Sequence, residues 1–295
     1  MIKKLLMVLS LFVTFSVFAG LKIGYSDFTA GSGCPTFQQC AAAGYNIVIV
    51  AFGTVSTTGS VSLTYYGPYS NLSQLTSAIT TAKQTYPQLK VLISFGGQNN
   101  TWNPSSSVNA QTLGTALANF CTSNNFDGID FDLETAVTDT YINSVIVQIK
   151  ATAPSLMITA APQAVVNNQG YFVTTGWNYG YNASIIAGNY TYVWPQFYNN
   201  TWCSINGVTE TSASYIPLWF NNVAPTTANP SGTGLPSSIT WIVGLPATPE
   251  AGNGCVGVDT NANITNMLKN YAGTMTWSTN ADMANNWNMV KNIMP

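Results

Sequence analysis

Negative charge is concentrated in one short segment of the sequence, FDGIDFDLE, at residues 126–134. The chain has only 10 Asp and Glu residues in 295, and this segment holds four of them: Asp127, Asp130, Asp132 and Glu134. Side chains alternate between the two faces of a β-strand, so Asp130, Asp132 and Glu134 are expected on one face. Carboxylates this close cannot all stay ionised, and at least one should hold a proton near neutral pH. A protonated carboxyl at the end of a strand is a candidate general acid.

A solvated acidic strand or a calcium site would also concentrate carboxylates. Large apolar residues, Ile129, Phe131 and Leu133, stand between the acids, which disfavours a solvated strand. The regular alternation also differs from a calcium-binding loop. Asp127 shares its face with the apolar residues and is expected to have a structural role.

Short runs of β-forming residues alternate with longer helical segments along the chain, which is typical of repeated βα units. We expect strands at residues 22–26, 46–52, 90–95, 127–133, 156–161, 192–197, 240–245 and 274–278. Helices are expected at residues 70–86, 110–123, 138–153, 263–272 and 281–293. Eight such units predict an α/β fold, a single-domain (β/α)8 TIM barrel, with the reactive groups at the carboxyl ends of the strands. A doubly wound open sheet is the alternative.

The first 19 residues have the pattern of a secretory signal peptide. Two lysines precede an apolar run, and the ending Val17-Phe18-Ala19 suits cleavage. We therefore expect residues 1–19 to be removed and residues 20–295 to form one domain. The apolar run is too short for a membrane span. The mature protein is expected to be secreted, in the extracellular space or the periplasm, with no membrane association.

The charge balance excludes some classes of partner. All eight basic residues are lysines, two of them in the leader, so the mature chain has six lysines against ten acids, and 6 − 10 = −4. Such a surface lacks the basic stripe that nucleic acid or an anionic membrane requires. With 6% charged residues and abundant Asn, Ser, Thr, Gly and aromatic residues, the composition favours neutral, hydroxyl-rich ligands.

Five cysteines in a secreted chain indicate disulfides with one thiol left over. We expect Cys34 to pair with Cys40 across a short loop, and Cys203 with Cys255 between two polar loops. Cys121 lies in an apolar helical stretch and is expected to stay free. The chain has no His, which disfavours a metal site.

The segment DGIDFDLE resembles the DxxDxDxE signature of glycoside hydrolase family 18. SFGG at residues 94–97 is similar to the SxGG element of that family. Further resemblance to plant class III chitinases and their bacterial relatives is found in AAPQ (160–163), QFYNN (196–200), GLPATPEA (244–251) and GTMTWS (273–278). The resemblance runs from the first expected strand to the last.

The resemblance implies a role for several residues. Glu134 is expected to donate a proton to the glycosidic oxygen, Asp132 to orient the acetamido group of the substrate, and Asp130 to share a proton with Asp132. The hydroxyl of Tyr198 is expected to donate to the acetamido carbonyl. The expected substrate-binding residues are Tyr25, Phe52, Gly97, Gln196, Asn199 and Trp277. Two more aromatic residues, Trp102 and Trp202, are expected to extend the cleft from loops.

The activity that this resemblance implies is a chitinase that retains configuration, with the 2-acetamido oxygen of the substrate replacing a protein nucleophile. Its partners would be chitin or N-acetylglucosamine oligomers, and we expect a monomer without a cofactor or a metal. An endo-β-N-acetylglucosaminidase acting on glycoprotein glycans would use the same chemistry in a differently shaped cleft. A non-catalytic carbohydrate-binding protein on the same barrel is the other alternative, and the retention of Glu134, Asp132 and Tyr198 counts against it.

Overall fold

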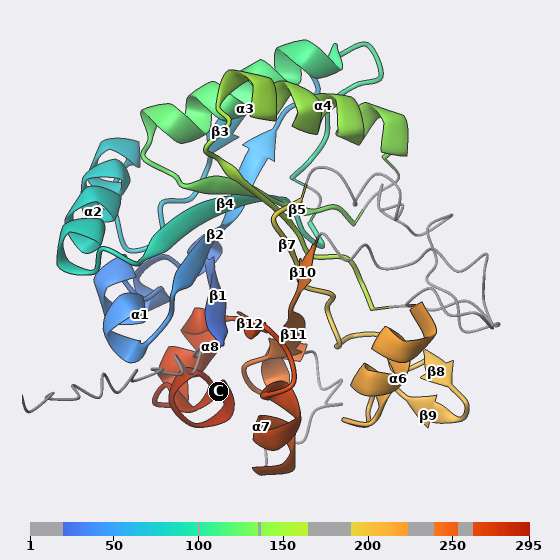
Figure 1. The fold of residues 1–295 in the computed structure, drawn as a ribbon. Helices are drawn as coiled ribbons and strands as arrows, with labels where there is room; N and C mark the ends of the chain where they lie inside the picture. The colour runs from blue at the N-terminus through green and yellow to red at the C-terminus, as the bar shows by residue number, and fades with distance from the viewer. Residues whose placement is uncertain (1–19, 100, 135–136, 165–189, 224–238, 253–261) are drawn as a thin grey trace, which may run out of the picture.

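Parallel strands form a ring in the computed structural model of the chain (Figure 1). The structure describes residues 20–99, 101–134, 137–164, 190–223, 239–252 and 262–295. Around the ring run β1 (Leu21–Asp27), β2 (Ile47–Val55), β4 (Lys90–Gly96), β5 (Gly128–Asp132), β6 (Met157–Ala160) and β7 (Tyr192–Val193), each paired with the next. Then follow β10 (Thr240–Trp241), β11 (Val243–Pro246) and β12 (Gly273–Trp277).

The ring closes through the last three of these segments. β10 pairs with β7, β11 pairs with β12, and β12 pairs with β1, all in parallel. Only Ile242 separates β10 from β11, so these two segments together fill one strand position. The result is a single-domain (β/α)8 barrel, as the sequence predicts, and the open sheet is excluded.

Helices cover the outside of the ring (Figure 1). Among the described residues they are α1 (Phe37–Ala43), α2 (Leu72–Thr85), α3 (Ala110–Ser123), α4 (Asp139–Thr152), α6 (Tyr215–Val223), α7 (Ala262–Leu268) and α8 (Thr279–Ala284). Short helical turns are η1 (Phe28–Gly33), η2 (Glu250–Gly252) and η3 (Met289–Ile293). β3 (Val61–Leu63) extends β2 as an antiparallel strand, and β8 (Ser204–Ile205) and β9 (Val208–Thr209) form a separate hairpin.

The long helices begin and face the barrel for local reasons. Asn109 caps α3 by accepting hydrogen bonds from two backbone N–H groups of the first turn. Leu113, Leu117 and Cys121 then recur every four residues and are buried, because this spacing keeps them on one face of the helix. Asn71 caps α2 by accepting the N–H of Gln74, and Leu75 and Ile79 lie on the buried face of that helix.

The last helix is not continuous, contrary to the expectation of one helix over residues 281–293. α8 ends at Ala284, and Asn286 and Trp287 have positive φ angles of 55° and 63°. The buried side chain of Asp282 accepts hydrogen bonds from the N–H groups of Met289 and Val290. At the break, these N–H groups have no carbonyl partner within a helix, and the Asp282 carboxylate accepts them instead at the beginning of η3. α1 and α6 were not expected from the sequence.

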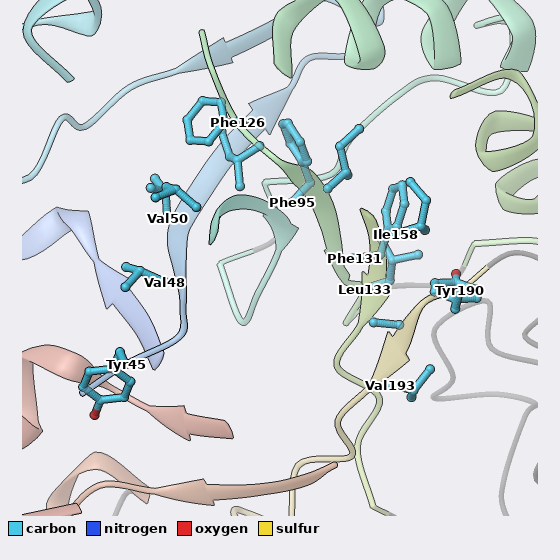
Figure 2. Close-up of a cluster of buried hydrophobic side chains, with 14 of the residues drawn as sticks. Tyr45, Val48, Val50, Phe95, Phe126, Phe131, Leu133, Ile158, Tyr190 and Val193 are labelled. Carbon is cyan, nitrogen blue, oxygen red and sulfur yellow. The ribbon is translucent and has the colours of Figure 1, made fainter. Parts of the chain in front are cut away.

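Apolar residues form two separate cores. The larger lies between the strands and the helices, and Figure 2 shows part of it, including Phe95, Phe131 and Leu133. The smaller fills the inside of the barrel and contains Ile23, Ile49 and Trp194 among its members. Since adjacent strand residues point to opposite sides, β2 contributes Val48 and Val50 to the larger core and Ile47 and Ile49 to the smaller one. The polar residues that project into the barrel share its interior with these apolar side chains.

The cysteines correct one expectation. Cys34 and Cys40 are buried free thiols, so the expected bond between them is not formed. The thiol of Cys34 donates to the carbonyl oxygen of Asp27, while helix α1 directs Cys40 toward Ser26 and Thr279. Cys121 is free and buried, as expected. Cys255 lies outside the described residues, so its pairing with Cys203 stays a prediction.

Among the helices in the described ranges, none combines the length and the apolar character that crossing a membrane requires.

Candidate active site

Strand β5 carries the acidic segment as the alternation predicts. Ile129, Phe131 and Leu133 are at most 1% exposed and pack in the larger, outer core. Figure 2 shows Phe131 and Leu133 there. Asp130 and Asp132 point into the barrel and are 0% and 6% exposed. The apolar residues hold the strand in register against the helices, and the acids are consequently held in a ladder on its inner face.

Asp130 is the base of this ladder and accepts three hydrogen bonds. Its Oδ2 accepts from the hydroxyls of Tyr25 and Ser94, both at 2.6 Å, and its Oδ1 accepts from Thr159 at 2.7 Å. Trp194 supports Tyr25 by donating its indole N–H to the phenol oxygen at 2.9 Å. Burial raises the pKa of Asp130 to about 6, and the three hydroxyl donors act against that rise.

Asp132 and Glu134 continue the ladder toward solvent. Asp132 accepts a hydrogen bond of 2.8 Å from the side-chain amide of Gln196. Burial, the charge of Glu134 and the charge of Asp130 raise the pKa of Asp132 well above its ordinary value. Burial raises the pKa of Glu134 to about 7. These directions agree with the expectation that neighbouring carboxyls in this strand retain a proton near neutral pH.

Tyr198 faces the carboxyls from the segment after β7. It is 4% exposed, and burial followed by the charges of Asp132 and Glu134 raises the pKa of its hydroxyl well above the ordinary value. The phenol is therefore neutral at physiological pH and able to donate a hydrogen bond.

A cleft of about 720 Å³ opens above the carboxyls at the carboxyl ends of the strands. Eight of the ten residues expected in the site line this cleft: Tyr25, Phe52, Asp132, Glu134, Gln196, Tyr198, Asn199 and Trp277. Asp130 lies beneath it, inside the barrel. The cleft is lined by both amide and aromatic groups, which suits a ligand with polar edges and apolar faces.

Three aromatic rings form one wall of the cleft. The ring of Trp277 is stacked on Phe52 with centroids 5.9 Å apart, and it is also 5.9 Å from Tyr25. Trp277 is only partly buried and lines the cleft, so part of its ring surface is available to a ligand. Pyranose rings have apolar faces of matching size, and stacking them on such a platform removes apolar surface from water.

Gly97 does not line the cleft but is required behind it. A Cβ atom on Gly96 would lie 1.9 Å from the carbonyl oxygen of Asp132, and one on Gly97 would lie 2.6 Å from the ring of Phe52. Both glycines also have positive φ angles, of 123° and 72°. The N–H of Gly97 donates to the carbonyl oxygen of Asp132 at 2.6 Å. The pair therefore lets β4 approach the acidic strand closely, and sugar contact by Gly97 stays a prediction.

Two tryptophans expected to extend the cleft have different positions. Trp202 is 70% exposed and lines the cleft. Trp102 is 2% exposed and packs edge-on against Phe131, with centroids 5.5 Å apart. The expectation for Trp102 is wrong because its backbone bridges to Val55, which turns the indole into the outer core.

Several polar residues of the site were not predicted as functional from the sequence. Thr159 and Trp194 complete the surroundings of Asp130, and Asn200 and Gln163 line the cleft beside Tyr198. Glu210 is buried behind Asn200, and burial raises its pKa to about 7. The available signal for Glu210 was scarcity, since the chain has only three Glu residues.

Comparison with known proteins gives a consistent result. The model of glycosyl hydrolases family 18 matches residues 22–288. Acidic endochitinase SE2 of Beta vulgaris is 27% identical over 261 residues, which cover 82% of this chain and 80% of that protein. A family GH18 chitinase from Chromobacterium violaceum has a TM-score of 0.72 at 23% identity, with 95% of this chain and 83% of that chain covered.

A second solved structure shares the fold. A fungal endo-β-N-acetylglucosaminidase from glycosyl hydrolase family 18 has a TM-score of 0.61 at 19% identity, with 88% of this chain and 89% of that chain covered. At these identities the solved structures support the fold, whereas the family match spans nearly all of the barrel and includes the acidic strand. The chain belongs to glycosyl hydrolases family 18.

Proposed function

We propose that the protein is a secreted chitinase that hydrolyses β-1,4 linkages between N-acetylglucosamine units with retention of configuration. The observation that carries this proposal is the ladder of Asp130, Asp132 and Glu134 beneath a cleft that also presents Tyr198 and an aromatic wall. The name of the Beta vulgaris relative supports chitin as the substrate class.

Glu134 is the general acid in this proposal, because it is the outermost carboxyl of the ladder and its raised pKa of about 7 keeps a proton available. It gives that proton to the glycosidic oxygen as the bond between this oxygen and C1 breaks. The carbonyl oxygen of the 2-acetamido group of the same sugar forms a bond to C1, which gives a cyclic oxazolinium ion and a Glu134 carboxylate.

Asp132 and Tyr198 hold the acetamido group for that attack. The carboxylate of Asp132 accepts the acetamido N–H and stabilises the positive charge of the ring, while its own proton passes to Asp130. The hydroxyls of Tyr25, Ser94 and Thr159 leave Asp130 able to carry either charge state. Tyr198 donates its hydroxyl to the acetamido oxygen and fixes its direction.

Water completes the reaction from the side that the leaving group has vacated. It adds to C1 and gives a proton to Glu134, and the bond between C1 and the acetamido oxygen breaks. Two inversions at C1 leave the β configuration unchanged. Glu134 is protonated again, and the proton held by Asp130 returns to Asp132, which restores the starting state.

The stereochemical course tests this mechanism. Proton NMR of the first-formed anomer on a chitin oligomer is expected to show the β product, and cellulose oligomers of equal length are expected to stay uncut because they lack the acetamido group. An initial α product, or comparable cleavage of the cellulose series, contradicts the mechanism.

Asp27 provides a further check, since its carboxylate also lines the cleft and a two-carboxylate mechanism would need a protein nucleophile. Its Oδ1 accepts from both the N–H and the hydroxyl of Thr29. Asp27→Asn is expected to keep turnover within about 10-fold of the wild type. A loss as large as that of Glu134→Gln would point to Asp27 as nucleophile.

An endo-β-N-acetylglucosaminidase is the second candidate, favoured by the fold that the chain shares with the fungal enzyme of that name. The chemistry would be the same, so the site residues cannot separate the two activities. Parallel digestion of colloidal chitin and a high-mannose glycoprotein separates them. Preferential release of the glycan would show that the glycoprotein, and not chitin, is the substrate.

Secretion belongs to the same proposal and rests on the leader pattern at residues 1–19. Mass spectrometry of the protein recovered from the culture medium is expected to give a chain beginning at Gly20. Recovery only of an uncleaved, cell-bound chain would contradict secretion.

A further inference from the structure

A chain of side-chain amides leads from Asp132 to a second buried carboxylate. Gln196 donates from Nε2 to Asp132 at 2.8 Å, and its Oε1 lies 3.5 Å from the donor Nε2 of Gln163. Gln163 accepts at Oε1 from Nδ2 of Asn200 at 2.6 Å. The same Nδ2 lies 3.3 Å from Oε1 of Glu210. Three side-chain amides, of Gln196, Gln163 and Asn200, thus connect the acidic ladder with Glu210.

Glu210 is held in place by its own backbone. It follows the hairpin of β8 and β9, whose turn at Asn206 and Gly207 has φ angles of 51° and 78°, as a tight hairpin turn requires. Its N–H donates to the carbonyl oxygen of Cys203 at 3.1 Å. The residue is 2% exposed and does not line the cleft, so its carboxylate is removed from water.

Glu210 also holds the backbone that carries Tyr198. Its Oε2 accepts the backbone N–H of Asn200 at 2.6 Å. The side chain of Asn200 folds back and donates to the carbonyl oxygen of Tyr198 at 2.8 Å. Asn199, between these two residues, has a positive φ of 68°, a conformation that needs support from its surroundings. The carboxylate therefore fixes the turn from both of its oxygens.

The direction of the amide chain follows from the chemistry of its two ends. In its ionised form Glu210 only accepts hydrogen bonds, so this form requires Asn200 to present its NH2 group to Oε1. Asn200 can then donate to the oxygen of Gln163, which leaves the NH2 of Gln163 for the oxygen of Gln196. The NH2 of Gln196 is left for Asp132 and for the carbonyl oxygen of Ala161, at 2.8 Å each. Both carboxylates favour the same orientation of all three amides.

We propose that Glu210 is a positioning residue that orients the acetamido-binding side of the cleft, acting on Tyr198 through Asn200 and on Asp132 through Gln163 and Gln196. This role rests on the proposed function, because it assumes that Tyr198 and Asp132 hold the acetamido group during attack on C1. Glu210 touches no substrate atom. Glu210 therefore affects the rate of the step in which the acetamido group bonds to C1, and it affects oligomer binding much less.

Glu210→Gln is the direct test, because it keeps the shape of the side chain. If the amide oxygen of the new Gln still accepts the backbone N–H of Asn200, its NH2 group replaces Oε1 and faces the NH2 group of Asn200, so that two donors oppose each other. The resulting misalignment of Tyr198 and Asp132 is expected to lower kcat on a chitin oligomer about 10- to 100-fold. KM is expected to stay within about threefold of the wild type. The thiazoline of the N-acetylglucosamine dimer, which mimics the cyclised intermediate, should inhibit about 10-fold less well, while inhibition by the dimer itself changes little.

Glu250→Gln is the matched control, since Glu250 is exposed and lies in η2 at the same end of the barrel. It should leave kcat and both inhibition constants unchanged. Wild-type kcat and thiazoline inhibition in Glu210→Gln overturn the proposed role. A wild-type protein that leaves chitin oligomers uncut overturns the proposed function and, with it, this role.

Asn200→Ala provides an independent route if Glu210→Gln does not fold. It removes the connecting amide but keeps the backbone bond to Glu210, and the same selective loss of kcat and thiazoline inhibition is expected. In the double variant, Glu210→Gln should add less than about threefold to the loss caused by Asn200→Ala, because both act along one path. Wild-type behaviour of Asn200→Ala, or fully multiplicative losses in the double variant, contradicts the proposed path.

Discussion

Asp127 and Asp130 belong to the same acidic segment but have opposite surroundings. Asp127 lies at the amino end of β5, partly exposed, where it pairs with Lys83 at 2.6 Å and lies 3.7 Å from the ammonium group of Lys90. It also accepts the N–H of Val91 at 2.8 Å. Asp130 lies inside the barrel, where its hydrogen-bond partners are the hydroxyls of Tyr25, Ser94 and Thr159.

The difference shows how one motif serves structure and chemistry together. A carboxylate beside lysines is neutralised by fixed positive charge, and Asp127 accordingly joins β5 to β4 and α2. The acids on the inner face are instead surrounded by hydroxyls, amides and one another. A proton must supply part of the neutralisation there, and a proton can be passed to a substrate.

Removing the outermost carboxyl of the inner face should have the largest effect. Glu134→Gln keeps the shape but has no proton of suitable acidity, so turnover on chitin oligomers is expected to fall by at least ~10²-fold. The melting temperature should stay the same or rise, because a buried charge is removed. Initial rates and thermal unfolding of the same preparation check this. Near-normal turnover would show that another group donates the proton.

Replacing Asp130 and Asp127 separately by Asn tests the comparison between the catalytic and the structural aspartate. Asp130→Asn cannot take a proton from Asp132, and we expect kcat to fall about 10-fold or more. Asp127→Asn loses a partly exposed ion pair and should lower stability by about 1 kcal/mol, with kcat within about twofold of the wild type. Parallel kinetics and thermal unfolding of both variants separate the effects. A larger kcat loss in Asp127→Asn than in Asp130→Asn would reverse the assignment.

The inner ladder could be predicted because a strand imposes a strict period of two. The identities of residues 129–134 alone determine which side chains face the barrel, and the structure places them there. The strand positions were also predictable, since each forms an apolar run between polar segments. In both cases the information is local in the sequence.

Contacts between distant segments could not be predicted in the same way. Trp102 and Trp202 both stand in polar loop sequence, yet only Trp102 is buried. Its segment exchanges backbone hydrogen bonds with Val55, whose N–H donates to Thr101 and whose carbonyl oxygen accepts from Asn103. The path from Glu210 to Asp132 likewise joins segments from three parts of the chain, and periodicity contains no signal for it.

Truncating the two tryptophans should therefore give different losses of moderate size. Trp202→Ala removes an exposed ring from the cleft, and KM for long chitin oligomers is expected to rise severalfold, by roughly 1 kcal/mol of binding, without loss of stability. Trp102→Ala empties a site in the outer core and should destabilise the fold by about 3–5 kcal/mol with KM unchanged. Oligomers of increasing length and thermal unfolding distinguish the two. An unchanged KM for Trp202→Ala at every length would exclude Trp202 from the substrate path.

The smallest expected effect is the dependence of stability on pH. Burial raises the pKa of Asp130 to about 6 and the pKa values of Glu134 and Glu210 to about 7, above the ordinary values of 3.8 and 4.5. Between pH 4 and 7 the unfolded chain has therefore released protons that the folded protein still holds, so the free energy of unfolding falls as the pH rises through this range.

The melting temperature is consequently expected to be higher at pH 5 than at pH 8, at constant ionic strength. Glu134→Gln should reduce the difference, because Gln does not titrate. Asp130→Asn should reduce it by a smaller amount, because the folded-state pKa of Asp130, about 6, lies closer to pH 5 than that of Glu134, about 7. Trp202→Ala, which changes no carboxyl, should keep the full difference. A melting temperature that rises from pH 5 to pH 8, or an unchanged slope in Glu134→Gln, would mean that the inner acids are already ionised and that fixed donors rather than protons neutralise them.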